Sequence, residues 1–133
     1  MRKPSGPPSV LIVDEDLGFV GWLGELFSQA GYRALPALSC RQAISLIKRF
    51  KLDVDVLAVN QDLPGVPGMI GMLRRPQRPL KIVVIRDHRG DGIVSIPAHA
   101  TLERPSAWEP ISRPVWLKKV QGALKQAEAK AAG

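Results

Sequence analysis

The sequence is poor in the residues that build disulfides and metal centres. It has one cysteine, Cys40, which cannot form a disulfide within the chain and has no second thiol with which to bind a metal. A lone thiol is typical of a reducing compartment, where it contributes to packing. The two histidines, His88 and His99, stand apart in loop-like segments without a paired ligand or nucleophile, so we expect both to be exposed to solvent.

Long apolar runs are missing as well. The longest runs, such as residues 10–13 and 82–85, are far shorter than the roughly 20 residues that cross a bilayer. No run of signal-peptide length precedes the first strand, so we expect residues 1–8 to be a flexible leader and the protein to be cytoplasmic. No glycine-rich phosphate loop follows that strand, which disfavours a dinucleotide enzyme.

What is present fits one globular domain with a basic surface. Of the 133 residues, 45% are hydrophobic and 23% are charged, a balance that allows one buried core. The net charge of +7 raises the prospect of an anionic partner. The basic residues are spread along the chain, however, without interleaved aromatics or a DNA-reading helix pair, so nucleic acid is the less favoured partner.

The apolar pattern predicts alternating strands and helices over residues 9–127, followed by a frayed tail at 128–133. Strands are predicted at residues 10–13, 32–38, 54–59, 80–85 and 100–103. Helices are predicted at residues 17–30, from Ser39, at about 68–75 and after Ser112, with a degenerate helix between the last two strands. The expected buried stripes are Ala43, Ile44, Ile47 and Phe50 in the second helix and Val115, Leu117, Val120 and Leu124 in the last.

This alternation predicts an α/β protein with a doubly wound parallel sheet, which places ligands beyond the carboxyl ends of the strands. The residues at those ends are polar or charged: Asp14 and Glu15, Asn60, Arg86, and Arg104. The chemistry of the protein is therefore expected at that edge of the sheet.

Two segments resemble the receiver domains of response regulators in two-component systems. Residues 10–16, VLIVDED, resemble the opening of a chemotaxis-regulator-like receiver, and residues 54–65, VDVLAVNQDLPG, resemble its central strand and the turn at Pro64 and Gly65. The resemblance covers nearly the whole chain. It implies a flavodoxin-like (βα)5 fold of five parallel strands with a shortened or irregular fourth helix. It also implies a role in bacterial phosphorelay signal transduction without enzymatic activity.

In that family the acidic pair, here Asp14 and Glu15, binds Mg²⁺, and an aspartate at the end of the third strand accepts a phosphoryl group from a histidine kinase. The position four residues before Pro64 is Asn60, a neutral amide that is a poor nucleophile. The resemblance therefore implies an atypical receiver that has lost its phosphorylation site and binds Mg²⁺ weakly, if it binds the ion.

The other switch positions of the family also differ. Arg86 stands at the hydroxyl position, Arg104 at the lysine position, and Thr101 where the switch aromatic is usual. We expect Arg86 or Arg104 to pair with Asp14 or Glu15 in place of the metal, which would hold the domain in one state.

Several alternatives stay open at this point. Arg113 and Pro114 also fit the basic-proline step that ends the fifth strand. Asp14 and Glu15 could form a ligand-free turn favoured by the first helix, and Asn60 could bond its local backbone. Asp62 is an alternative phosphoryl acceptor. Among the large aromatics, Trp22 is expected in the core, while Trp108 and Trp116 are candidates for a partner surface.

The leading interpretation is a pseudo-receiver that works by protein-protein docking, with a histidine kinase or another two-component protein as partner and a homodimer as an open alternative. The second is a phosphoryl-accepting response regulator with a non-standard site. The third is a basic nucleic-acid-binding module on the same fold.

Overall fold

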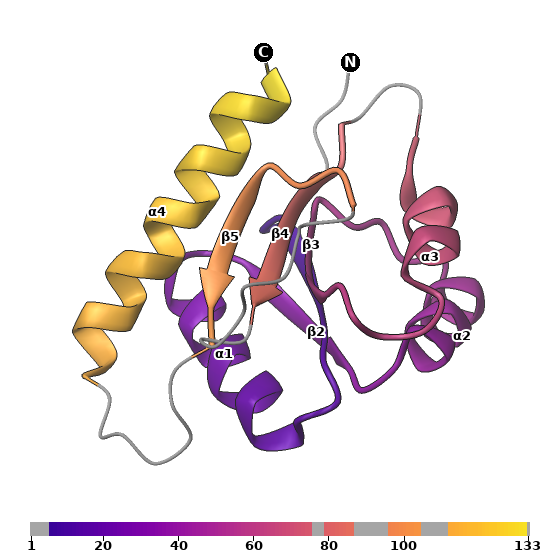
Figure 1. Ribbon diagram of the computed structural model, residues 1–133, viewed down its shortest axis with the longest axis horizontal. Helices are drawn as coiled ribbons and strands as arrows, with labels where there is room; N and C mark the ends of the chain where they lie inside the picture. Colours follow the sequence, from indigo (N-terminus) through magenta and orange to yellow (C-terminus); the bar gives the residue numbers. More distant parts are fainter. Residues whose placement is uncertain (1–5, 76–78, 87–95, 105–111, 133) are drawn as a thin grey trace.

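Five parallel strands form a single sheet in the order β2-β1-β3-β4-β5 (Figure 1). The computed structural model describes residues 6–75, 79–86, 96–104 and 112–132. Its strands are β1 (Ser9–Val13), β2 (Arg33–Ala37), β3 (Val56–Asn60), β4 (Lys81–Arg86) and β5 (Ala100–Glu103). Its helices are α1 (Leu17–Gln29), α2 (Cys40–Phe50), α3 (Val66–Leu73) and α4 (Arg113–Ala132). The predicted doubly wound sheet is confirmed.

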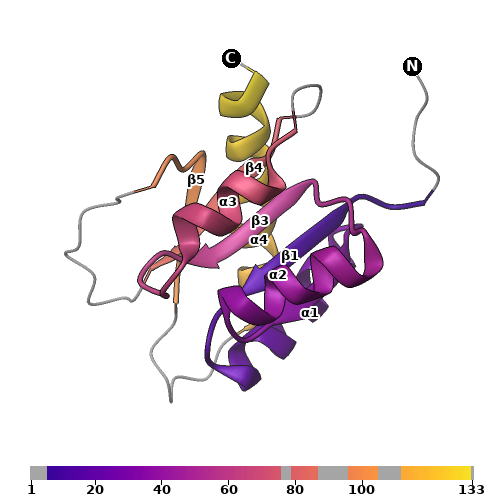
Figure 2. The ribbon, with the colours of Figure 1, turned by 90° about the vertical axis from the view of Figure 1, so that its right-hand side faces the viewer.

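The helices cover both faces of the sheet, with α1 and α4 on one face and α2 and α3 on the other (Figures 1 and 2). Neighbouring strand residues therefore bury their side chains in opposite layers. Ile12 packs in the layer of α1 and α4, whereas Leu11 packs in the layer of α2 and α3, and both are fully buried. This two-sided burial explains why the central strands are continuous apolar runs and not alternating ones.

Side-chain caps and glycines set the helix ends. The Asp16 carboxylate accepts a hydrogen bond from the Phe19 amide at 3.1 Å, and the Ser39 hydroxyl accepts one from the Gln42 amide at 3.0 Å, so each satisfies a free N–H of its helix. Gly31, with φ of +96°, follows α1 in the left-handed conformation that favours glycine. These ends agree with the helices predicted at residues 17–30 and from Ser39, although the sequence did not single out Asp16 as a cap.

Two predicted helix faces need correction. Phe50 is 60% exposed because it lies in the last turn of α2, where Lys51 adopts a left-handed conformation and ends the helix. In α4, Val115 is exposed, and the buried stripe instead begins at Trp116 and continues through Val120. Residues 128–132 belong to α4, where the sequence predicted a frayed tail.

The segment between β4 and β5 lies partly outside the described residues. Residues 96–99 contain no helix, and residues 87–95, where the degenerate fourth helix was expected, are outside the described ranges. Within the described part of the chain, no helix combines the length and apolarity needed to span a membrane.

Candidate functional site

The carboxyl edge of the sheet brings together residues that are far apart in the sequence. Val13 is paired with Val59 in register, so Asp14 and Asn60 follow neighbouring residues of β1 and β3. On the next strands, the Arg104 amide donates to the Arg86 carbonyl at 2.6 Å, which places Arg104 directly beyond β5. The topology thus sets an acid, an amide and two arginines at one edge.

Asp14 is fully buried, and both of its carboxylate oxygens have partners. Oδ1 accepts a hydrogen bond from the Asp16 amide at 2.9 Å. Oδ2 forms a salt bridge with Nη2 of Arg104. The Asp14 amide donates to the carbonyl of Ala37 at 3.2 Å, so the backbone is fixed as well. A buried carboxylate is costly without a compensating cation, and Arg104 supplies that cation.

The Arg104 guanidinium has two further partners. Its Nη1 lies 3.5 Å from Oδ2 of Asp16, and its Cζ lies 4.5 Å from the centroid of the Phe19 ring. Only 21% of the Arg104 side chain is exposed, so these contacts are largely shielded from water. The predicted pairing of Arg104 with Asp14 is present, whereas Glu15 is exposed.

Asn60 ends β3 in a local turn. Its Oδ1 accepts a hydrogen bond from the Asp62 amide at 3.0 Å, and its carbonyl accepts one from the Leu63 amide at 3.2 Å. Gly65 then adopts φ of +87° as the chain enters α3, which explains the glycine in this turn. The backbone-bonding interpretation of Asn60 is therefore confirmed.

These residues do not fit a Mg²⁺ site. The ion prefers several free oxygen ligands in near-octahedral geometry. Here both oxygens of Asp14 are engaged, the amide oxygen of Asn60 is bonded to the backbone, and Glu15 is exposed. Within the described ranges, no group of three or more Asp, Glu, His or Cys side chains could hold a metal ion.

Comparison with known proteins gives the fold but no close relative. No protein-family model matches the sequence. No curated protein matches it either. Solved structures of receiver domains do match. The N-terminal domain of a response regulator/sensory box/GGDEF three-domain protein from Carboxydothermus hydrogenoformans superposes with a TM-score of 0.65 at 18% identity, covering 92% of this chain and 98% of that one.

Two further structures match over similar lengths. A response regulator receiver protein from Burkholderia phymatum gives a TM-score of 0.64 at 19% identity, covering 89% of this chain and 95% of that one. The chemotaxis response regulator CheY4 of Vibrio cholerae gives 0.58 at 19% identity, covering 88% and 98%. This chain has the receiver fold. The fold expected from the acidic turn and the central strand is confirmed.

Two other residues singled out from the sequence, Arg86 and Thr101, lie on β4 and β5. Thr101 is exposed on β5, in register with Val84, and it lines a shallow hollow with the half-buried Arg86. Arg113 begins α4 and pairs with Glu25 at 2.8 Å. The fifth strand therefore ends at Glu103, immediately before Arg104, and the alternative ending at Arg113 is wrong.

His99 is half-buried and not simply exposed, which corrects the prediction. Its Nδ1 accepts a hydrogen bond from the Ile82 amide at 2.9 Å. Burial lowers its pKa, and the positive charges of Arg74 and Lys130 lower the pKa further. The second histidine, His88, lies outside the described residues.

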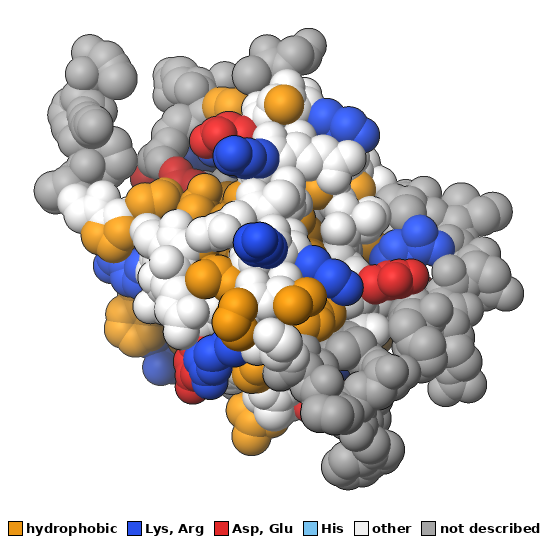
Figure 3. Space-filling view, turned by 90° about the vertical axis from the view of Figure 1, so that its left-hand side faces the viewer, with side chains coloured by type: hydrophobic (Ala, Val, Ile, Leu, Met, Phe, Trp, Pro, Cys, Tyr) orange, Lys and Arg blue, Asp and Glu red, His pale blue; other side chains and the backbone are white. Residues whose placement is uncertain are grey.

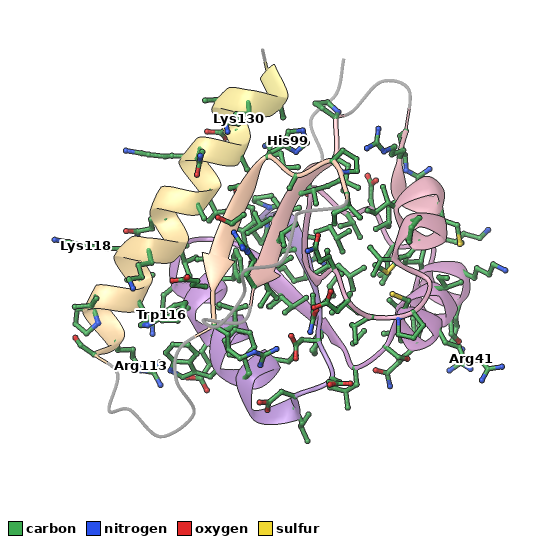
Figure 4. All side chains as sticks on the ribbon, in the orientation of Figure 1. Arg41, His99, Arg113, Trp116, Lys118 and Lys130 are labelled. Atoms are coloured by element: carbon green, nitrogen blue, oxygen red, sulfur yellow. The ribbon has the colours of Figure 1, made fainter. Side chains whose placement is uncertain are left out.

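A row of aromatic rings connects the site to α4. The centroids of Phe19 and Trp22 are 6.2 Å apart, and Trp22 meets Trp116, which is labelled at the start of α4 in Figure 4, edge-on at 5.1 Å. Trp116 is only 5% exposed, so this candidate for a partner surface packs in the core of the chain. The other tryptophan proposed for that surface, Trp108, lies outside the described residues. Sequence reasoning missed Phe19, although it stands three residues after the capping Asp16.

Proposed function

We propose that this protein is a receiver-like docking module of two-component signalling that works without phosphoryl transfer, because an internal arginine holds its acidic pocket. The observation that carries the proposal is the salt bridge between Arg104 and the buried Asp14. The proposed partner is a histidine kinase or another two-component protein. In this proposal the protein binds and does not catalyse.

Loss of the phosphoryl acceptor supports the first part of the proposal. Transfer to a carboxylate requires a nucleophilic oxygen and positive charge to stabilise the phosphoryl oxygens. The amide of Asn60 is a poor nucleophile, and its oxygen is bonded to the Asp62 backbone. Asp62 itself is exposed in the turn.

Arg104 supports the second part of the proposal, which is that an internal arginine holds the acidic pocket. A guanidinium keeps its charge throughout the physiological pH range, and its planar N–H groups suit a carboxylate. Arg104 therefore neutralises Asp14 without an exchangeable ion, and the contact with the Phe19 ring fixes its position. A pocket held in this way has a single state, which suits constitutive docking.

Fluorescence during a Mg²⁺ titration with beryllofluoride tests the proposal, because Trp22 lies next to Phe19 and Phe19 contacts Arg104. The natural chain, Asn60→Asp, and Asn60→Asp combined with Arg104→Lys are compared. We expect a response in the double variant alone. A response in the natural chain would overturn the proposal. A response in the single variant Asn60→Asp, in which Arg104 is intact, would overturn the role given to Arg104.

Incubation with labelled acetyl phosphate tests the phosphoryl-accepting alternative directly. We expect no acid-labile label in the natural chain. If the natural chain takes up label and the Asp62→Asn variant does not, the protein accepts a phosphoryl group at Asp62, and the docking proposal is wrong.

A further inference from the structure

A histidine ring holds the amino end of β5, the strand at one edge of the sheet. In the sheet formed by the described residues, β5 has four residues and pairs only with β4, beginning where Ala100 pairs with Val83. Directly before this pair, His99 exchanges two hydrogen bonds with Ile82 of β4. The His99 amide donates to the Ile82 carbonyl at 2.8 Å, and Nδ1 of the ring accepts from the Ile82 amide at 2.9 Å. The ring therefore supplies one of the bonds that join β5 to β4.

The other anchors of β5 are unevenly distributed along the strand. Leu102, in the carboxyl half, is buried in the layer of α1 and α4. Arg104 follows it and forms the salt bridge with Asp14. The amino half has only the small side chain of Ala100 in that layer. The amino half therefore depends more on the His99 ring than the carboxyl half does.

The bond from the Ile82 amide requires the neutral form of the His99 ring. A neutral imidazole that accepts at Nδ1 carries its proton on Nε2, and protonation adds an N–H group at Nδ1. Two N–H groups would then face each other. Ile82 is fully buried, so its amide would lose its acceptor without access to water while the strands stay paired. Protonation and strand pairing therefore oppose each other at this position.

The charges around His99 act in the same direction. Burial is the main cause of the lowered pKa of His99, and the positive charges of Arg74 and Lys130 lower the pKa further. Arg74 directly follows α3, and Lys130 lies in the last turn of α4. The acidic residue of α4, Glu128, lies 3.8 Å from Lys81 of β4, which offsets its charge. A protonated His99 would therefore be repelled from two sides.

Positive charge extends along the whole of α4. The helix carries five basic residues and one acidic residue, and Figure 3 shows Lys and Arg side chains spread over the face that it forms. The last buried residue of α4 in the described part of the chain is Ala127, so the turn that carries Lys130 has little apolar packing. Repulsion from a charged His99 therefore acts on a weakly held end of α4 as well as on β5.

We infer that His99 is an acid-sensitive latch: when its ring takes up a proton it releases Ile82, and residues 97–101 separate from β4 while the rest of the sheet stays folded. The inference goes beyond the proposed docking function and does not depend on it. The buried side chains of Ile96 and Leu102 bound the segment that opens. In the open form, water replaces the two partners that Ile82 loses.

The direction of the pH dependence follows from the neutral ring. Because the native pKa of His99 is lowered, the latch is closed at neutral pH and opens as the pH falls through that native pKa. An edge strand can open in this way without disturbing its neighbours, since β5 has β4 on one side only among the described strands.

Two-dimensional NMR of the full chain during a pH titration tests the latch. Resonances of the His99 ring give its native pKa, and nuclear Overhauser contacts between this ring and the Ile82 amide show whether the two residues stay together. The internal control is the contact between Leu11 and Leu57, which are paired in β1 and β3. One pH unit below the native pKa, the contact from His99 to Ile82 should be lost in about 90% of the molecules, and the control contact should be unchanged.

Two variants separate the two histidines of the chain. His99→Gln offers an amide oxygen to Ile82 and does not titrate in this range, so β5 should stay paired at every pH tested. His88→Gln is the matched control and should open like the natural chain. If His88→Gln abolishes the opening, the latch is assigned to the wrong residue.

A second pair of variants tests the role of charge. Lys130→Gln removes one repelling cation, so the native pKa of His99 should rise. Lys118→Gln makes the same change farther along α4, where Figure 4 shows Lys118 well away from His99, and should leave that pKa unchanged. Equal rises in both variants would contradict the role given to Lys130.

The titration of the natural chain decides the inference without any variant. A contact from His99 to Ile82 that persists when the ring is fully protonated would overturn the latch. Loss of the contact between Leu11 and Leu57 at the same pH would also overturn it, because protonation would then unfold the whole domain and not one end of β5.

Discussion

Replacing Arg104 with methionine should destabilise the protein strongly, because the buried carboxylate of Asp14 would lose its cation. Removing one member of a buried ion pair costs about 3–5 kcal/mol. Here the Arg104 side chain is 21% exposed, and Asp14 keeps its bond from the Asp16 amide, so we expect about 2–3 kcal/mol. Part of this loss is the contact with Phe19.

Urea unfolding followed by tryptophan fluorescence measures the effect. With a slope of about 1–3 kcal/mol per molar urea, the midpoint should fall by about 0.7–3 M. A double-mutant cycle with Asp14→Asn separates the pair from its surroundings. The two single variants should each lose unfolding free energy. The double variant should lose about 2 kcal/mol less than the sum of these two losses.

Arg113→Met is the matched control. It removes the same side chain from the pair with Glu25, whose two side chains are 48% and 61% exposed, and should cost less than about 1 kcal/mol. If Arg104→Met costs no more than this control, or if the cycle is additive, the salt bridge does not hold the pocket and the reasoning is wrong.

Three further predictions concern the rest of the fold. The lowered pKa of His99 means that its neutral form contributes stability above its ordinary pKa of about 6.5, and that this stability is lost as pH falls through the folded value. Urea titrations across this range should show a larger loss for the natural chain than for His99→Gln. Burial raises the pKa of the Cys40 thiol, so a thiol reagent should label it slowly in the native protein and rapidly in urea; rapid native labelling would contradict its packing. Gly21→Ala meets no atom within 4 Å and should stabilise α1 by about 1 kcal/mol, whereas Gly31→Ala, at φ of +96°, should destabilise the protein by a similar amount, as thermal unfolding can check.

The ends of the central strands could be predicted from the sequence because a polar residue directly follows the apolar run of each strand. Val13 is followed by an acidic turn, and the β3 run stops at Asn60. A strand buried on both faces leaves a continuous apolar signal, and its sharp end fixes which residues reach the carboxyl edge. Opposite charges at that edge predict a pair between an arginine and a carboxylate, but only the structure selects Arg104 and Asp14 for it.

Helix faces were harder to predict. In α4, Trp116, Val120, Ala123 and Ala127 form the buried stripe, but the alanines add little apolar signal, so the pattern pointed equally well to Val115. In α2, Phe50 lies on the correct stripe but beyond the point where the helix packs on the sheet. Burial of this kind depends on tertiary contacts that periodicity does not contain.

The salt bridge between Arg104 and Asp14 joins two groups of the same chain. A free ion leaves a site when its concentration falls, but a tethered side chain keeps the same local concentration at every dilution. Chelators and changes in cellular magnesium would therefore leave this pocket unaltered. Under the proposed docking function, the strength of the signal would follow the number of molecules synthesised and degraded.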